Sequence, residues 1–284
     1  MIREAGPDDR AAIEALLTAR LDQAMFPLTN LRDHGLARGD FASPHDHALR
    51  IWRSGDSLVA LTRAGMILPL CDGTPDLSGL PAALHGLTVT GSVGPAASAR
   101  PVLKALRLDR VPTVTDRDEP GFALDLANLT IPDVPGTTLR PITPADLPLV
   151  TDWRQTYIGE VLGSTGPEAR AKAESDLAGY LTRDSHRLLI RDGQPVAMTG
   201  FNAILPEIVQ IGGVYTPANL RGKGYARRAV ALHLAETRAT GTSRAVLFAA
   251  SDAAARAYRA IGFQLSEPFT LFLLSTPTAI AACL

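Results

Sequence analysis

The sequence predicts an α/β protein with mixed sheets, divided into two domains. Three observations carry this prediction: the length of 284 residues, an alternation of strand and helix patterns, and a proline-rich stretch near the middle. Single domains cluster at about 100 to 200 residues, so the chain is long enough for two. Tight hairpins join antiparallel strands and helical crossovers join parallel ones, and the sequence indicates both, so mixed sheets are expected.

The proline-rich stretch is "LANLTIPDVPGTTLRPITPADL", residues 126–147. It predicts a linker near 130–137 between a first domain at 1–130 and a second at 137–284. The two parts open alike, with "MIREAGPDDRAAIEALL" at Met1 and "TTLRPITPADLPLVTDWR" at Thr137. Each reads as a short strand, a proline-containing helix start and an apolar-periodic helix, which suggests an internal duplication.

The second part can be assigned element by element from its periodicity and its turn residues. A short Asp192-Gly193 turn joins two strand patterns and predicts a β-hairpin. Gly241 follows an amphipathic segment and is a natural helix stop. The expected helices are 145–162, 167–182, 225–240 and 252–262, and the expected strands are 186–193, 194–205, 208–216, 243–251 and one or two within 263–275.

The first part is less regular. "SLVALTRAGMILPLC" indicates a hairpin that turns at about 63–65. "LTVTGSVGPAASARPVLKAL" reads as a strand, a glycine turn and a helix. We expect this unit to occupy the place that a phosphate-binding turn takes in the second part.

Composition excludes several classes of protein. The formal net charge is −1, with 28 Lys+Arg against 29 Asp+Glu, which argues against a nucleic-acid binder. The two cysteines, Cys71 and Cys283, form neither a disulfide framework nor a zinc-ligand spacing, so we expect no metal and a reducing, cytoplasmic location. No apolar run is long enough for a membrane span, so no membrane partner is expected.

The stretch "TPANLRGKGYARRAV", residues 216–230, places two glycines and a lysine before a helical pattern. A P-loop would require glycine at Pro217 and serine or threonine at Gly224. A dinucleotide fingerprint that starts at Gly222 would require glycine at Arg227. Neither of these phosphate-binding motifs is present.

What remains is an [RQ]-x-x-G-x-[GA] turn made by Arg221, Gly222, Lys223, Gly224, Tyr225 and Ala226. It resembles the pyrophosphate-binding loop of the GCN5-related N-acetyltransferase (GNAT) superfamily. Unsatisfied backbone N–H groups at a helix start favour an anion, and glycine lets the backbone approach it. The resemblance implies that these residues hold the pyrophosphate of coenzyme A, with Arg221 and Lys223 adding positive charge.

A second motif supports the resemblance. In "SDAAARAYRAIGF", Ala254, Tyr258, Gly262 and Phe263 match the segment N-x-x-A-x-x-x-Y-x-x-x-G-F of the family, while Ser251 stands in place of asparagine. The resemblance covers residues 137–275. It implies a GNAT fold in the second part and a degenerate GNAT-like first part, a tandem arrangement similar to that of mycothiol synthase and its relatives.

The resemblance implies an N-acetyltransferase that moves an acetyl group from acetyl-CoA to an amine by direct attack in a ternary complex. Tyr258 would protonate the leaving thiolate, or else only pack its ring under the sheet. Val214, Tyr215 and Thr216 would extend the sheet onto the pantetheine arm, and Ser251 would hydrogen-bond that arm. The acceptor would be a small-molecule or peptide amine. The alternative function is a non-catalytic acyl-CoA sensor.

Two further expectations concern the acceptor. Glu207 and Gln210 are the polar candidates for a general base on the strand "IVQIGGVYT" and its entry, and Glu207 is expected to be solvated. The glycine pair of this strand, Gly212 and Gly213, indicates a bulge or a close backbone approach. The first domain is expected to shape the acceptor cleft or a homodimer surface.

Overall fold

The computed structural model describes residues 2–281, so Cys283 lies outside the described residues. The chain divides into two compact units. Unit 1 comprises the chain up to Glu119 together with the part from Glu267 onward, and unit 2 is Pro120–Ser266. Each unit contains a seven-stranded mixed sheet, which confirms the predicted fold class. The unit boundaries differ from the predicted division at 130–137, because two strands lie in the sheet of the other half.

Unit 1 has the strand order β1-β2-β3-β4-β5-β14-β6. Its strands are β1 (Arg3–Glu4), β2 (Leu49–Ser54), β3 (Ser57–Thr62), β4 (Met66–Leu70), β5 (Thr88–Pro95), β6 (Thr113–Glu119) and β14 (Phe269–Ala279). Its helices are α1 (Arg10–Ala19), α2 (Leu21–His34), α3 (Leu80–Ala83) and α4 (Ala96–Ala105). The predicted hairpin is present between β3 and β4, where Gly65 has a φ of 87°.

Unit 2 has the strand order β8-β9-β10-β11-β12-β7-β13. Its strands are β7 (Gly121–Asp125), β8 (Thr137–Pro141), β9 (His186–Arg191), β10 (Gln194–Ile204), β11 (Ile208–Tyr215), β12 (Arg244–Phe248) and β13 (Gln264–Leu265). Its helices are α5 (Leu147–Tyr157), which continues as a π-helical turn (Ile158–Leu162), α6 (Gly166–Arg183), α7 (Tyr225–Ala239) and α8 (Asp252–Arg259).

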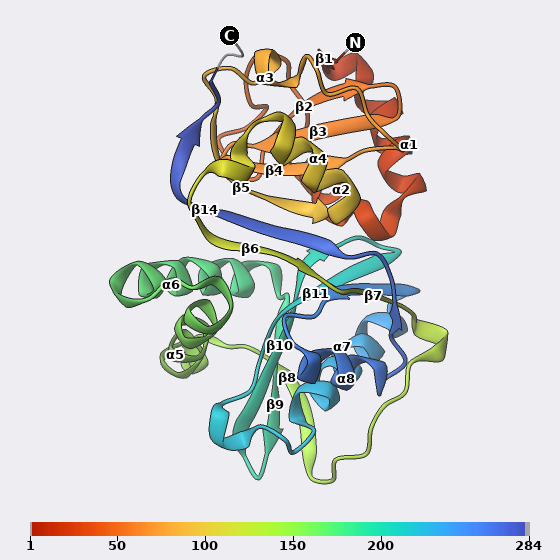
Figure 1. The fold of residues 1–284 in the computed structure, drawn as a ribbon. Helices are drawn as coiled ribbons and strands as arrows, with labels where there is room; N and C mark the ends of the chain where they lie inside the picture. Colours follow the sequence, from red (N-terminus) through yellow and green to blue (C-terminus); the bar gives the residue numbers. More distant parts are fainter. Residues whose placement is uncertain (1, 282–284) are drawn as a thin grey trace. The chain divides into compact units, whose positions relative to one another are not determined.

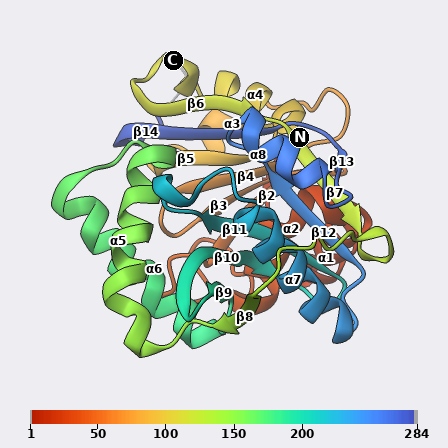
Figure 2. The same ribbon diagram turned by 90° about the horizontal axis from the view of Figure 1, so that it is seen from below.

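The two sheets have the same strand order, and each has exchanged one strand with the other half of the chain. In unit 1, β14 from the end of the chain lies between β5 and β6 (Figure 2). In unit 2, β7 from the first half pairs with both β12 and β13. An interior strand satisfies its backbone groups on both edges, so each unit depends on a segment from the other half of the sequence.

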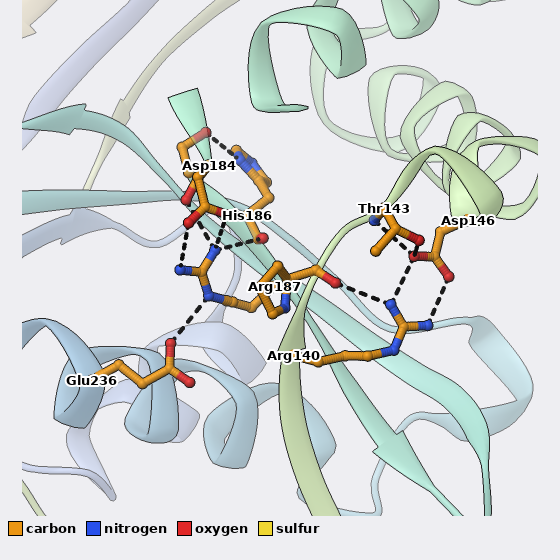
Figure 3. Close-up of polar contacts among 9 residues, drawn as sticks. Arg140, Thr143, Asp146, Asp184, His186, Arg187 and Glu236 are labelled. Carbon is orange, nitrogen blue, oxygen red and sulfur yellow. Dashed lines mark hydrogen bonds and ion pairs between the residues drawn. The ribbon is translucent and has the colours of Figure 1, made fainter. Parts of the chain in front are cut away.

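The start of each unit repeats the same local structure, which supports the predicted duplication. In unit 1, Arg3 on β1 donates to the Asp9 carboxylate at 2.8 Å, and the N–H of Gly6 donates to the same carboxylate at 3.0 Å. In unit 2, Arg140 on β8 donates to Asp146 at 2.7 Å (Figure 3). The N–H of Thr143 donates to Asp146 at 2.9 Å. In both units the acidic residue closes a short 3₁₀ turn that leads into the first helix.

The helices of unit 2 cover both faces of its sheet (Figure 1). Trp153 of α5 and Tyr180 of α6 pack against Met198 and Tyr215, which defines the α5/α6 face. Residues of α7 and α8 pack with alternate side chains of β11 on the opposite side, which defines the α7/α8 face. Nε of Arg187 on β9 also donates a hydrogen bond to the Glu236 carboxylate on α7 at 3.1 Å (Figure 3).

The prediction for the glycine turn of unit 1 was wrong. The shared strand order makes β5 and α4 the counterparts of β12 and α8, not of β11 and α7. The counterpart of α7 is α3, which has four residues against fifteen in α7. The sequence shows a strand, a glycine turn and a helix at both positions, and only the sheet order distinguishes them.

Candidate acyl-coenzyme A site

Strands β11 and β12 pair at one end and separate at the other. Their parallel ladder runs from the pair Ile208 and Arg244 to the pair Gln210 and Val246. Beyond that pair β11 continues to Tyr215 beside β10 only, while β12 continues beside β7. We call this separation the fork. It leaves one backbone edge of 211–215 without a paired strand among the described residues.

A bulge in β11 lies at the fork. The register of β10 and β11 shifts between the pairs Gly200 with Gly212 and Met198 with Tyr215. Gly213 is the extra residue and has a φ of 63°, a left-handed conformation that favours glycine. This confirms the bulge predicted from the glycine pair.

The predicted pantetheine-contacting residues follow the bulge. Val214 lies against the core of the α7/α8 face. The Tyr215 ring is buried on the α5/α6 face, with its centroid 5.8 Å from that of Trp153. The Thr216 hydroxyl is buried without a hydrogen-bond partner in the described structure. The side chains of Val214 and Tyr215 therefore pack into the two cores, and their backbone follows the open edge.

The turn after β11 forms the start of α7 as predicted. Gly222 and Gly224 have φ values of 79° and 80°. Gly224 occupies the N-cap position, and within the described residues no side chain caps α7. The N–H groups of the first helical turn, from Tyr225 onward, therefore point outward without a side-chain partner. Lys223 is exposed and Ala226 is half-buried in the same turn.

Arg221 is held by contacts that the sequence did not indicate. Its Nη2 donates to both carboxylate oxygens of Glu160 at 2.8 and 2.9 Å. Its Nε donates to the carbonyl oxygen of Thr216 at 2.9 Å. Glu160 belongs to the π-helical turn after α5 and stands 61 positions earlier in the sequence, so no local pattern could reveal the pair.

The remaining predicted residues lie on or beside α8. The Ser251 hydroxyl accepts a hydrogen bond from the N–H of Ala254 at 3.2 Å and so caps α8. The Tyr258 ring is buried in the core of the α7/α8 face, edge-on to Phe263 with ring centroids 5.9 Å apart. Tyr258 therefore packs beneath the sheet on the α7/α8 side of the fork.

Comparison with known proteins identifies the domain that contains the fork. The Acetyltransferase (GNAT) family profile matches residues 149–263, which include β11, the turn, α7 and α8. These residues form a GNAT acetyltransferase domain. No curated protein matches the sequence.

Solved structures extend the likeness to the whole chain at the level of fold. A GCN5-related N-acetyltransferase from Kribbella flavida is 17% identical, with a TM-score of 0.58 over 93% of this chain and 96% of that chain. One from Sphaerobacter thermophilus is 17% identical, with a TM-score of 0.54 over 100% and 96%. A tandem GNAT protein from the clavulanic acid biosynthesis pathway is 15% identical, with a TM-score of 0.53 over 100% and 99%. The chain therefore has a tandem GNAT fold.

The strands of unit 1 that correspond to the fork stay together. Met66 pairs with Gly91 and Ile67 with Ser92, and the same register brings Pro69 beside Gly94. A Cβ atom on Gly94 would lie 2.9 Å from Cδ of Pro69, so the two strands are in contact there. Among the described residues of unit 1, the two strands therefore stay in contact beyond their ladder, and the short helix α3 stands in the place of α7.

The GNAT domain also contains a buried polar layer that sequence reasoning missed. His186 is 1% exposed and stacks on Tyr180 with ring centroids 3.4 Å apart. Its Nδ1 lies 2.9 Å from the Ser185 hydroxyl, while its Nε2 has no hydrogen-bond partner in the described structure. The sequence signal for this buried ring was the presence of glycines on β10 and β11. Gly200 and Gly213 make room for the His186 ring.

We expect Gly200→Ala to destabilise the GNAT domain by about 1–3 kcal/mol, because overpacking forces buried groups to move. A Cβ atom on Gly200 would lie 2.1 Å from the His186 ring. Chemical denaturation measures the change. The control is Gly179→Ala within α6, where the nearest atom would be 3.7 Å away and alanine favours the helix. Equal effects of both substitutions would contradict the prediction.

Two buried histidines predict a loss of stability in mild acid. Burial lowers the pKa of His233 to about 3 and the pKa of His186 well below its usual value. Below about pH 6.5 the unfolded chain binds protons that the folded chain does not, so stability falls as the pH falls. Each histidine contributes about 1.4 kcal/mol per pH unit in that window. Denaturation midpoints from pH 7.5 to 5 test this, and His233→Phe should reduce the slope. An unchanged slope would contradict the assignment.

Three further findings concern metal ligands, the Cys71 thiol and membrane-spanning helices in residues 2–281. No group of three or more His, Cys, Asp or Glu side chains in this range could hold a metal ion. Burial raises the pKa of the Cys71 thiol to about 11, which disfavours a reactive thiolate. No helix in the same range has the length and apolar character needed to cross a membrane.

Proposed function

We propose that the GNAT domain transfers an acetyl group from acetyl-CoA to an amine acceptor by direct attack in a ternary complex. One observation carries the proposal: the open edge of β11 is followed, after the turn at 216–224, by the start of α7, which no side chain in the described structure caps. A pantetheine arm with its amide groups can pair with such an edge, and a pyrophosphate can accept bonds from such a helix start.

The residues fit coenzyme A in order along the chain. The backbone of Val214, Tyr215 and Thr216 would pair with the pantetheine amides. The backbone N–H groups of the turn would bind the pyrophosphate, namely those of Gly222, Gly224, Tyr225 and Ala226. Lys223 is exposed and adds charge, while Arg221 must share its guanidinium with Glu160. Ser251 would contribute its hydroxyl to the pantetheine arm while it caps α8.

The reaction forms a C–N bond to the thioester carbon and breaks the C–S bond. The leaving thiolate requires a proton, and Tyr258 is assigned to supply it from the α7/α8 side. The ordinary pKa of a tyrosine, about 10, is close enough to that of a thiol, about 8.5, to allow proton transfer between the two types of group. The acceptor is a small-molecule or peptide amine. We assign coenzyme binding to the GNAT domain alone, since the corresponding strands of unit 1 stay in contact at Gly94 and Pro69 and the four-residue α3 stands in the place of α7.

The test combines binding and turnover. Calorimetry with acetyl-CoA measures affinity, and release of free thiol with a broad panel of small-molecule and peptide amines measures transfer. We expect both binding and transfer. Binding without any transfer across the panel would favour the acyl-CoA sensor instead. Absence of binding would refute the proposed cofactor.

A further inference from the structure

Gln210 stands at the point where the fork opens. It forms the last pair of the ladder between β11 and β12, opposite Val246, and is 2% exposed. Its neighbours Val209 and Ile211 both belong to the core of the α7/α8 face. Successive side chains of a strand point to opposite faces, so the Gln210 side chain lies on the α5/α6 face.

The orientation of the Gln210 amide is set by one hydrogen bond. Its Nε2 donates to the carbonyl oxygen of Ile211 at 2.8 Å. The reversed amide would place two oxygens against each other, so Oε1 must be the atom that points away. Oε1 is buried without a hydrogen-bond partner in the described structure. Leaving a buried acceptor without a hydrogen bond is unfavourable, and a donor on a bound ligand would satisfy it.

Tyr258 and Gln210 lie on opposite faces of the sheet. Tyr258 belongs to the same hydrophobic core as Val209 and Ile211, on the α7/α8 side. A thioester carbon in the fork would therefore have a proton donor on one side and a hydrogen-bond acceptor on the other. This arrangement suits displacement of a thiolate by an amine, because the attacking nitrogen loses a proton and the leaving sulfur gains one.

We propose that Oε1 of Gln210 accepts a hydrogen bond from the N–H of the attacking amine and orients its lone pair toward the thioester carbon. An amide oxygen holds the nitrogen but removes no proton. The amine must therefore arrive neutral, which selects acceptors whose conjugate acid has a pKa of about 8 or below, such as α-amino groups, over lysine-type amines near 10.4. This inference rests on the proposed acetyl transfer.

The protons and bonds balance without a further co-reactant. The amine lone pair forms the C–N bond, and the C–S bond breaks with its electron pair on sulfur. The proton lost from nitrogen passes to water, and the proton gained by sulfur comes from Tyr258, which regains one from water. His186 is the alternative proton acceptor on the α5/α6 face, since a Cβ atom on Gly213 of the bulge would lie 2.7 Å from its Nε2. Glu207 is exposed at the entry of β11, away from the fork.

The first experiment compares Gln210→Met with Thr199→Val. Both substitutions remove a buried polar atom without a partner in the described structure, but Thr199 lies on β10, outside the fork. For Gln210→Met we expect kcat/KM for the amine to fall about 10- to 100-fold. The Kd of acetyl-CoA should stay within two-fold and the Tm of the unliganded protein should not decrease. Thr199→Val should keep full activity. Unchanged activity of Gln210→Met, or a lower Tm, would overturn the inference.

The second experiment is the pH dependence of kcat/KM for substrates found in the amine panel. We expect the substrates to be amines whose conjugate acids have a pKa near 8 or below. For each of them kcat/KM should fall at low pH, and the midpoint of this fall should follow the pKa of that amine. A midpoint that is the same for all amines and disappears in His186→Phe would assign a base to the protein and overturn the inference. Substrates found only among amines with pKa above 10 would overturn it too. Acetyl-CoA binding is measured in every variant. Retained binding together with one of these contrary results means that the inference fails while the proposed function stands.

Discussion

Replacing Tyr258 by phenylalanine should lower kcat about 10²- to 10³-fold while the Kd of acetyl-CoA stays within two-fold. General acid catalysis contributes effects of this size, and the substitution removes only the hydroxyl. The ring is buried in the core of the α7/α8 face and packs edge-on to Phe263, so phenylalanine preserves the apolar contacts. Steady-state release of thiol and calorimetric binding measure the two quantities.

The matched control is Tyr157→Phe at the end of α5, where the ring faces the Arg154 guanidinium at 4.8 Å. Its kcat should stay within two-fold of that of the unmodified protein. A decrease in acetyl-CoA affinity as large as the decrease in kcat would make Tyr258 a structural residue. Only a selective loss of turnover supports proton donation.

Replacing Gly224 by valine should weaken acetyl-CoA binding more than about 100-fold. A β-branched residue is disfavoured by roughly 1–2 kcal/mol in the left-handed region, and Gly224 has a φ of 80°. The new side chain would also meet the Arg227 guanidinium, since a Cβ atom would lie 3.2 Å from its Nε. Distortion at this position moves the N–H groups that are assigned to the pyrophosphate. Calorimetry with acetyl-CoA measures the loss.

Gly241→Val provides the control at the other end of α7. Gly241 has a φ of 108° and no atom within 4 Å of a Cβ position, so valine is strained there as well. Both variants should lose a similar amount of stability, and only Gly224→Val should lose binding. If Gly224→Val keeps its affinity, the pyrophosphate assignment is wrong.

The local structure of the candidate site was predictable because its signals are local. The Asp192-Gly193 turn has left-handed φ values at both residues, 50° and 75°, which is the hairpin geometry the dipeptide favours. Gly224 begins α7 and Gly241 follows its end, at the positions expected from the pattern. A turn that opens a helix depends on consecutive backbone groups, so a short motif is enough to locate it.

The residues that complete the site could not be predicted. Glu160 reaches Arg221 across 61 positions, and His186 reaches the bulge over Gly200 of a neighbouring strand. These contacts depend on which strands are neighbours and on the register of each pair. No periodicity within a segment contains that information.

The sequence by itself determined the kinds of elements, the duplicated start of the two halves and the turn at the start of α7, because each depends on backbone preferences within a few residues. Only the tertiary structure decided that β7 and β14 exchange sheets, that β11 and β12 separate after Gln210, and that unit 1 keeps its corresponding strands together. Strand pairing is non-local: any apolar strand can satisfy an open edge, and the choice is made by packing across the whole unit.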